Sequence, residues 1–170
     1  MVTHDSSLAK RVERTVIIAD GEVVNEYVAR ALPTLSPQLM LEVSRRVKAA
    51  TFPAGATILQ EGQSGNHFYI LTQGAVEVVL KRPGGSDVVA ETVHPNHFFG
   101  EIFLMNQNRT LASVRAVPEA PVELLTLDGV VFQELMAESQ EFCELMQSVG
   151  QKRLVNNHRV LEMGKVIHEN

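Results

Sequence analysis

The sequence predicts a mainly β protein of the α+β class, with a β-sandwich or barrel between flanking helices. Two observations support this. Between Thr51 and Leu127, short apolar stretches alternate with glycine-containing turns at the spacing of a sandwich or barrel. On both sides of that region, apolar residues recur at helical intervals. At 170 residues and 45% hydrophobic composition, the chain can bury a real core as one domain with attached helices.

The first thirty or so residues allow two interpretations. Residues 16–24 fit a hairpin with a turn at Asp20-Gly21. A helical stripe is equally visible in Val23, Val24, Tyr27, Val28 and Ala31. Of the two, we favour a helix that follows Gly21.

A clearer helix is predicted over roughly residues 37–49. Ser36 is a good N-cap, and Pro37 suits the first helical position. Leu39, Val43 and Val47 then recur at helical spacing, until the chain reaches Phe52-Pro53.

The β region is predicted from its apolar stretches and the turns between them. The stretches are residues 58–59, 68–71, 76–80, 88–90, 113–117 and 122–127. Glycines at 55, 62, 74 and 84–85 supply turn positions that are free to take positive φ.

Helical periodicity returns after Asp128-Gly129. One helix carries Val131, Phe132, Leu135 and Met136 on a single face, and a second begins near Ser139 and runs toward the end of the chain. The second helix carries a heptad seam in steps of four and three residues: Phe142, Met146, Val149, Arg153, Asn156, Val160, Met163 and Ile167. An amphipathic helix of this kind needs a surface to bury, either on the β region or on a second copy.

The stretch Phe99-Gly100-Glu101-Ile102 is the strongest functional signal. A short helix beginning at Gly100 would direct unsatisfied backbone N–H groups toward an anion, and glycine would let a ligand approach closely. Glu101 would lie beside that anion, where a neutral sugar hydroxyl suits its carboxylate better than a phosphate does. A phosphate and a ribose together imply a nucleotide.

Residues from about Thr34 to Met136 resemble the cyclic nucleotide-binding domain family. This family includes catabolite-activator-type regulators, regulatory subunits of cAMP-dependent kinase and cyclic-nucleotide-gated channels. The segments that carry the resemblance are 52–55, 58–62, 68–74, 99–102, 112–116 and 127–136. The resemblance implies an eight-stranded antiparallel β-roll of the jelly-roll type, in which Glu101 holds a ribose 2′-hydroxyl and an arginine pairs with the cyclic phosphate.

The expected arginine is displaced in this sequence. Its position falls on Thr110, with Arg109 one residue earlier, and strand alternation would aim Arg109 away from the pocket unless a bulge near Asn108 re-aims it. Loss of a charge-assisted hydrogen-bonded pair would weaken the binding of a cyclic phosphate by roughly ten- to a hundredfold. Leu111 replaces a small or hydroxyl residue and adds bulk. The predicted ligand-binding residues are Phe99, Gly100, Glu101, Ile102, Arg109, Thr110 and Leu111.

The predicted organisation is a helical lead over residues 1–33, a cyclic nucleotide-binding-like β-roll over 34–138 and a C-terminal helix over 139–170. The predicted function is that of a sensor and not an enzyme. The module would bind cAMP, cGMP or a related small anionic ligand, and transmit binding through its C-terminal helices to an unidentified downstream protein. Residues 127–136 would act as the hinge, by resemblance.

Two alternatives remain open. The first is an orphan domain that keeps the fold without a nucleotide and acts as a homodimeric interaction module. The second is a cupin-like metal protein using His94, His97 and Glu101, although their spacing differs from the paired histidines of cupins. We expect no metal.

The predicted homodimer uses the C-terminal helix, as in catabolite-activator-type proteins, with Asn156 at a core position setting the register. Formal charge of −5 argues against a nucleic-acid partner, and no apolar run is long enough for a membrane span. The single cysteine, Cys143, fits a small buried hydrophobe. We expect a cytoplasmic protein.

Overall fold

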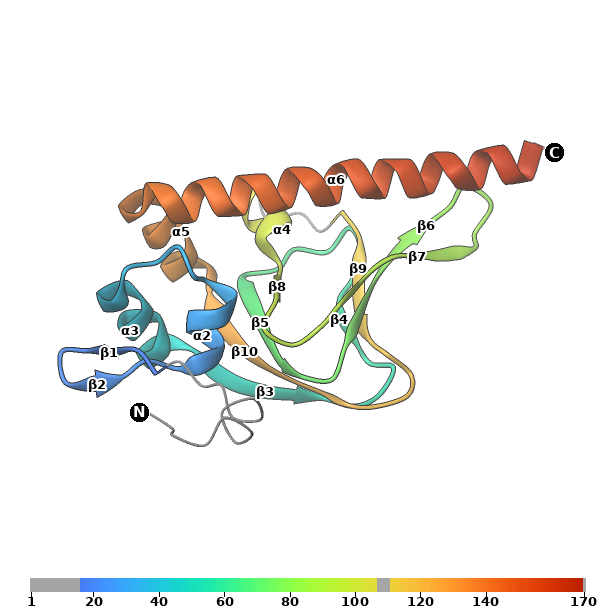
Figure 1. The fold of residues 1–170 in the computed structure, drawn as a ribbon. Coiled ribbons are helices and arrows are strands. Elements are labelled where there is room, and N and C mark those ends of the chain that lie inside the picture. Colours follow the sequence, from blue (N-terminus) through green and yellow to red (C-terminus); the bar gives the residue numbers. More distant parts are fainter. Residues whose placement is uncertain (1–15, 107–110, 170) are drawn as a thin grey trace, which may run out of the picture.

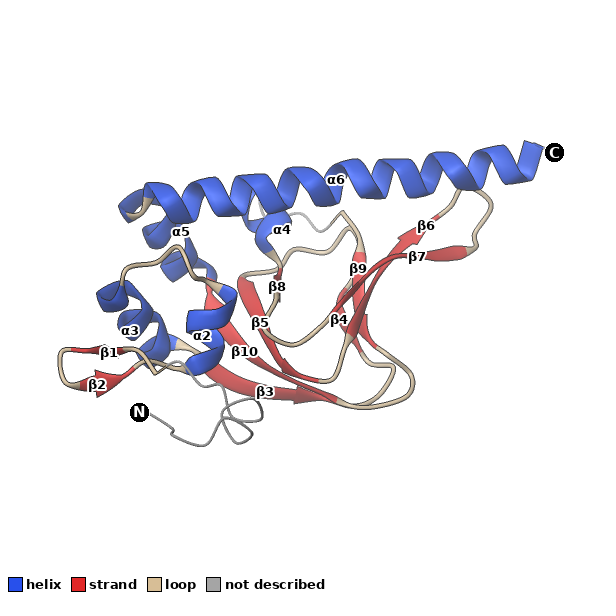
Figure 2. Ribbon diagram, in the orientation of Figure 1, coloured by secondary structure: helices blue, strands red, loops and turns tan. Residues whose placement is uncertain are grey.

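Two four-stranded antiparallel sheets form a β-roll in the computed structural model, which describes residues 16–106 and 111–169, with side chains as far as 163. One sheet has the order β3 (Lys48–Phe52), β10 (Val122–Asp128), β5 (His67–Gln73) and β8 (Phe98–Phe99). The other has the order β4 (Thr57–Leu59), β9 (Ser113–Ala116), β6 (Val76–Lys81) and β7 (Asp87–Val93). Helices gather at one end of the roll, and a long helix crosses it (Figure 1, Figure 2). The predicted eight-stranded β-roll with flanking helices is confirmed.

The N-terminal segment combines both interpretations of its sequence. Strands β1 (Ile18–Ala19) and β2 (Glu22–Val23) form a hairpin, whose turn takes positive φ at Asp20 and Gly21. Helix α2 (Glu26–Ala31) follows. A helix does follow Gly21 as predicted, but Val23 and Val24 of the expected helical stripe lie before it, and Val23 belongs to the hairpin. The helix begins later because the Asn25 side chain caps it, accepting hydrogen bonds from the N–H groups of Tyr27 and Val28.

Helix α3 (Pro37–Arg46) begins as predicted, with the Ser36 hydroxyl accepting from the Leu39 N–H. It ends three residues before the predicted boundary at 49. Lys48 has already entered β3, where it pairs with Thr126 of β10. Strand pairing overrides helical periodicity there.

A chain of phenylalanines joins the β-roll to the C-terminal helices. Phe68 of β5 contacts Phe132 of α5 (Gly129–Glu138) with ring centroids 5.2 Å apart, and Phe132 contacts Phe142 at 5.6 Å. All three side chains are fully buried. Burial of each contributes about 1.5–3 kcal/mol, so the first turns of the last helix belong to the core.

Helix α6 (Gln140–Glu169) is the long helix that crosses the β-roll (Figure 1). Its predicted seam begins by packing on the roll, since Phe142 and Met146 are completely buried. Farther along, the Asn156 side-chain amide donates to the backbone carbonyl of Ala90 in β7 at 2.9 Å. Asn156 is therefore engaged by its own chain, and its role in setting a dimer register stays a prediction. No helix among the described residues is long and apolar enough to span a membrane.

Candidate functional site

The stretch singled out in the sequence forms a strand, a turn and a short helix. Phe98–Phe99 form β8, Gly100 is the N-cap with a φ of 98°, and Glu101–Met105 form helix α4. A Cβ at Gly100 would lie 3.0 Å from the His67 carbonyl oxygen and 3.2 Å from the Phe103 ring. Glycine is thus required both by the backbone conformation and by the close packing around it.

Glu101 is buried at the start of α4, with 1% of its surface exposed. One carboxylate oxygen, Oε1, accepts a hydrogen bond from Nη1 of Arg153 at 2.5 Å. The other oxygen, Oε2, has no hydrogen-bond partner among the described residues. Burial raises the pKa of the Glu101 carboxyl above its ordinary value, while the Arg153 charge acts in the opposite direction. A buried carboxylate oxygen without a partner among the described residues can accept a hydrogen bond from a hydroxyl group.

Arg153 of α6 connects three elements at this point. Its Nε donates to Oε2 of Glu91 in β7 at 3.0 Å, and its Nη2 donates to the Phe98 carbonyl of β8 at 2.8 Å. The guanidinium carbon lies 5.5 Å from the centroid of the Phe98 ring. Since the side chain is only 13% exposed, these contacts fix α6 against the roll in a shielded environment.

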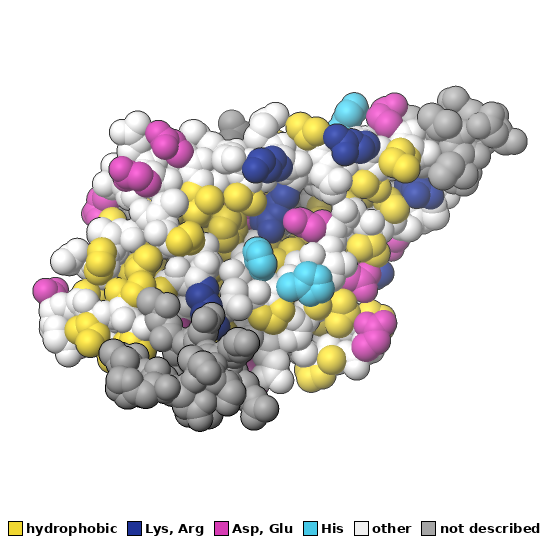
Figure 3. Space-filling view, in the orientation of Figure 1, with side chains coloured by type: hydrophobic (Ala, Val, Ile, Leu, Met, Phe, Trp, Pro, Cys, Tyr) yellow, Lys and Arg dark blue, Asp and Glu magenta, His cyan; other side chains and the backbone are white. Residues whose placement is uncertain are grey.

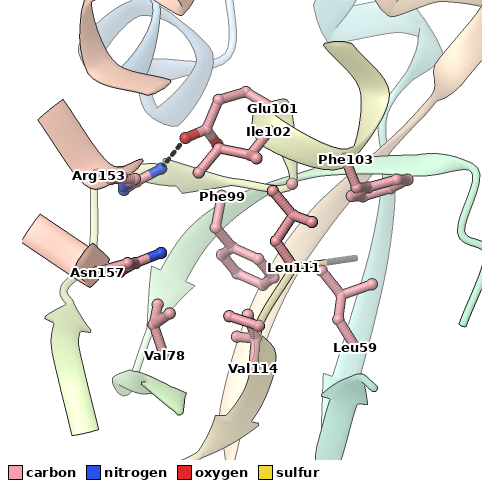
Figure 4. Close-up of a pocket in the computed structure, with 12 residues that line it drawn as sticks. Leu59, Val78, Phe99, Glu101, Ile102, Phe103, Leu111, Val114, Arg153 and Asn157 are labelled. Carbon is pink, nitrogen blue, oxygen red and sulfur yellow. Dashed lines mark hydrogen bonds and ion pairs between the residues drawn. The ribbon is translucent and has the colours of Figure 1, made fainter. Parts of the chain in front are cut away.

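A pocket of about 50 Å³ lies between this cluster and the interior of the roll (Figure 4). Its walls are largely apolar and include Leu59, Val78, Phe99, Ile102, Leu111 and Val114. Polar side chains enter from two sides: Glu101 from α4, and Arg153 and Asn157 from successive turns of α6 (Figure 4).

A larger groove of about 430 Å³ runs between α4 and α6. Met105, Gly150 and Leu154 line it, and it shares Ile102 and Leu111 with the pocket. These two side chains therefore contact both spaces.

Most of the predicted site residues lie close together. The structure brings Phe99, Gly100, Glu101, Ile102 and Leu111 together around the pocket. Predicted ligand residues Arg109 and Thr110 lie outside the described residues.

Sequence reasoning missed three contributors to the site: Glu91, Arg153 and Asn157. One signal for Arg153 was present, namely a charged residue on an otherwise apolar helical seam. It did not show which partner the charge meets.

The histidines of the metal alternative do not form such a site in the described part of the chain. His97 Nδ1 lies 3.1 Å from the Pro95 carbonyl oxygen. No group of three or more His, Cys, Asp or Glu side chains suited to hold a metal ion occurs among the described residues.

Residues 49–139, more than half of the chain, match the cyclic nucleotide-binding domain, so the chain belongs to this family. A cyclic nucleotide-gated potassium channel, mll3241, from Mesorhizobium japonicum is 31% identical over 77% of this chain and 35% of its own length. A CRP-like cAMP-activated global transcriptional regulator from Mycobacterium tuberculosis is 24% identical over 77% of this chain and 58% of its own length. The chain thus spans between about a third and three fifths of these relatives. The family is a regulatory domain and not a catalytic one.

Solved structures share the fold. The regulatory domain of Toxoplasma gondii PKA with cAMP superposes with a TM-score of 0.66 at 21% identity, covering 74% of this chain and 48% of that one. The regulatory subunit of a cAMP-independent protein kinase A from Trypanosoma cruzi, bound to guanosine, gives a TM-score of 0.69 at 21% identity, covering 81% and 49%.

Proposed function

We propose that the chain is a sensor module in which Glu101 binds the ribose of a cyclic nucleotide or a related ribosyl ligand, and α6 transmits that binding to a partner protein. The family supports a cyclic nucleotide such as cAMP or cGMP as the ligand class. The observation that carries the proposal is the state of the Glu101 carboxylate, which has one oxygen on Arg153 and one oxygen without a partner among the described residues.

This arrangement couples ligand and helix through one group. A ligand hydroxyl that donates to Oε2 of Glu101 changes the charge distribution on the carboxylate that holds Arg153. Arg153 and Asn157 also line the pocket, so a bound ligand gains direct contacts with α6. Binding energy can therefore shift the position of the helix, which is the property that a downstream protein would recognise.

The test is calorimetry at millimolar concentrations of cAMP, cGMP, adenosine and guanosine. The wild type is expected to bind at least one of them, with affinity falling at least about tenfold in Glu101→Ala because a charged hydrogen-bond acceptor is lost. Glu77→Ala is the matched control: Glu77 pairs with Arg115 at 3.3 Å and does not line the pocket, so its loss should leave binding unchanged. Absence of heat from all four compounds would contradict the proposal.

A second candidate is a homodimeric interaction module, which need not bind a ligand. Leu154, Val155 and Met163 of α6 are 39%, 47% and 58% exposed, and large exposed apolar side chains favour an interface. The face in Figure 3 shows basic and acidic side chains interspersed along α6.

In this second candidate the interface partner is another copy of α6. Light scattering should then give a dimer mass that falls to a monomer in Leu154→Glu. The control is Val130→Glu on α5, where Val130 is 62% exposed and lies outside that interface. A monomer mass for the wild type would contradict this second candidate.

A further inference from the structure

We propose that Glu91 is a positioning residue of this site. By holding the Arg153 guanidinium on β7, it limits Arg153 to one oxygen of Glu101 and keeps the other oxygen, Oε2, for a ligand hydroxyl. Glu91 acts through Arg153 and need not touch the ligand itself. This inference rests on the proposed function, because it explains how the ribose acceptor of the same site is kept accessible.

Strand β7 meets α6 where its pairing with β6 is irregular. Two successive residues of β6 pair with Glu91 and Val89, so Ala90 is an extra residue on β7, as in a β-bulge. The Ala90 carbonyl accepts the 2.9 Å hydrogen bond from the Asn156 amide. About one turn earlier on α6, Arg153 donates to Glu91. Two neighbouring residues of β7 are thus bound by two residues of α6, which places Arg153 opposite Glu91.

Three acceptors set the orientation of the Arg153 guanidinium. Its Nε donates to the Glu91 carboxylate, at 3.0 Å from one oxygen and 3.4 Å from the other. Its Nη2 donates to the Phe98 carbonyl at 2.8 Å. Its Nη1 donates to Oε1 of Glu101 (Figure 4). Arg153 thus contacts Glu101 through one nitrogen, although a guanidinium and a carboxylate frequently pair through two parallel N–H···O bonds.

Loss of the Glu91 carboxylate would free Nε and let the guanidinium turn toward Glu101. Oε2 of Glu101 is buried and lacks a partner among the described residues, and an unmade hydrogen bond of a buried charged group is costly. A freed guanidinium therefore gains most by pairing with both oxygens of Glu101. Oε2 would then be occupied by the protein itself and closed to a sugar hydroxyl.

The direction of the effect separates positioning from simple charge. Arg153 lines the pocket and Glu91 is its ion-pair partner at 3.0 Å. If Glu91 acted only through its negative charge, its removal would strengthen the binding of an anionic cyclic phosphate. If Glu91 positions Arg153, its removal weakens the binding of a ligand that donates to Oε2 and affects a ligand without that hydroxyl much less.

Calorimetric titration of the whole chain with a ligand and its 2′-deoxy analogue tests the inference. The ligand is whichever of cAMP, cGMP, adenosine and guanosine binds most tightly. The wild type should bind it about tenfold more tightly than the 2′-deoxy analogue, because the hydroxyl donates to a charged acceptor. In Glu91→Ala this ratio should fall to about twofold or less, as it should in Glu101→Ala, because Oε2 is lost to the ligand in both.

Two further variants control for shape and charge. Glu91→Gln is isosteric and keeps an oxygen that can accept from Nε of Arg153, so its ratio should stay within about threefold of the wild-type value. This variant tests the inference even if Glu91→Ala folds poorly, and circular dichroism checks the folding of both. Glu77→Ala removes a carboxylate that pairs with Arg115, and it should leave the ratio unchanged.

Two results would overturn the inference. The first is a wild-type ratio in Glu91→Ala, since equal weakening of both compounds would give Glu91 a structural role alone. The second is an equal fall of the ratio in Glu91→Gln and Glu91→Ala, which would assign the effect to charge. A ratio near one in the wild type would instead contradict the proposed contact between Glu101 and the ribose, so the two failures are distinguishable.

Discussion

Replacement of Arg153 by methionine tests how strongly α6 is held to the β-roll. Methionine keeps an apolar stem of comparable length but removes the charge and every hydrogen bond of the guanidinium. Glu101, at 1% exposure, would then be a buried carboxylate without a counter-ion. Breaking a buried pair by removing one partner costs about 3–5 kcal/mol, and we take the lower end because protonation of Glu101 relieves part of the cost. The contact with Glu91, whose side chain is 33% exposed, adds less than about 1 kcal/mol.

The expected loss in the free energy of unfolding is therefore about 3–4 kcal/mol, measured by urea denaturation at neutral pH. At this chain length it corresponds to a fall of about 10 °C in Tm. The double variant Glu101→Gln with Arg153→Met should recover about 2 kcal/mol, because a buried amide needs no counter-ion.

Arg115→Met provides the control for this prediction. Arg115 pairs with Glu77 at 3.3 Å, and its side chain is 38% exposed, so its loss should cost no more than about 1 kcal/mol. If Arg153→Met and Arg115→Met were equally stable, or if the double variant recovered nothing, the buried pair would not hold α6 as described.

Three further predictions concern pH, the cassette turn and the helix seam. Burial raises the folded-state pKa of Glu101, so the contribution of this carboxyl to stability is complete below the unfolded value of 4.5 and is lost as pH rises through the folded pKa. Glu101→Gln should therefore gain stability relative to the wild type as pH rises through that range. Parallel pH profiles of the free energy of unfolding for the two proteins would refute this. Gly100→Ala should cost about 1 kcal/mol more than Gly84→Ala in denaturant unfolding, because both have positive φ but only Gly100 meets other atoms, and equal losses would contradict the close approach. Asn156→Ala should lower the free energy of unfolding by about 1 kcal/mol, because the hydrogen bond to Ala90 is lost, and should leave the molecular mass in light scattering unchanged. A changed mass would indicate that Asn156 lies at a subunit interface.

Local sequence signals predicted most of the fold. Glycine turns between apolar stretches indicated the β-roll, and Ser36 with Pro37 marked the start of α3. The end of α3 was misjudged because Val47 continues the helical period although it precedes a strand that pairs with β10. Pairing between strands distant in sequence is not visible in local periodicity.

The sequence predicted the part of the candidate site around α4, but not the part that α6 supplies. Gly100 and Glu101 stand next to each other in the sequence, and their types alone suggest a ligand cassette. Arg153 lies 52 positions after Glu101 and reaches it only because Phe142 and Met146 seat α6 on the roll. Periodicity showed that the seam must be buried, yet the same pattern suits an intramolecular surface and a dimer equally well.

The account depends most on Glu101 serving both the ligand and α6, and hydrogen exchange measures this most directly. Amides of residues 150–157 should exchange at least about fivefold more slowly at saturating adenosine or cAMP, whichever binds more tightly, because the ligand adds contacts with Arg153 and Asn157. The change should disappear in Glu101→Ala at the same ligand concentration. Slower exchange at residues 98–105 with no change in α6 would contradict the claim that one carboxylate links the two.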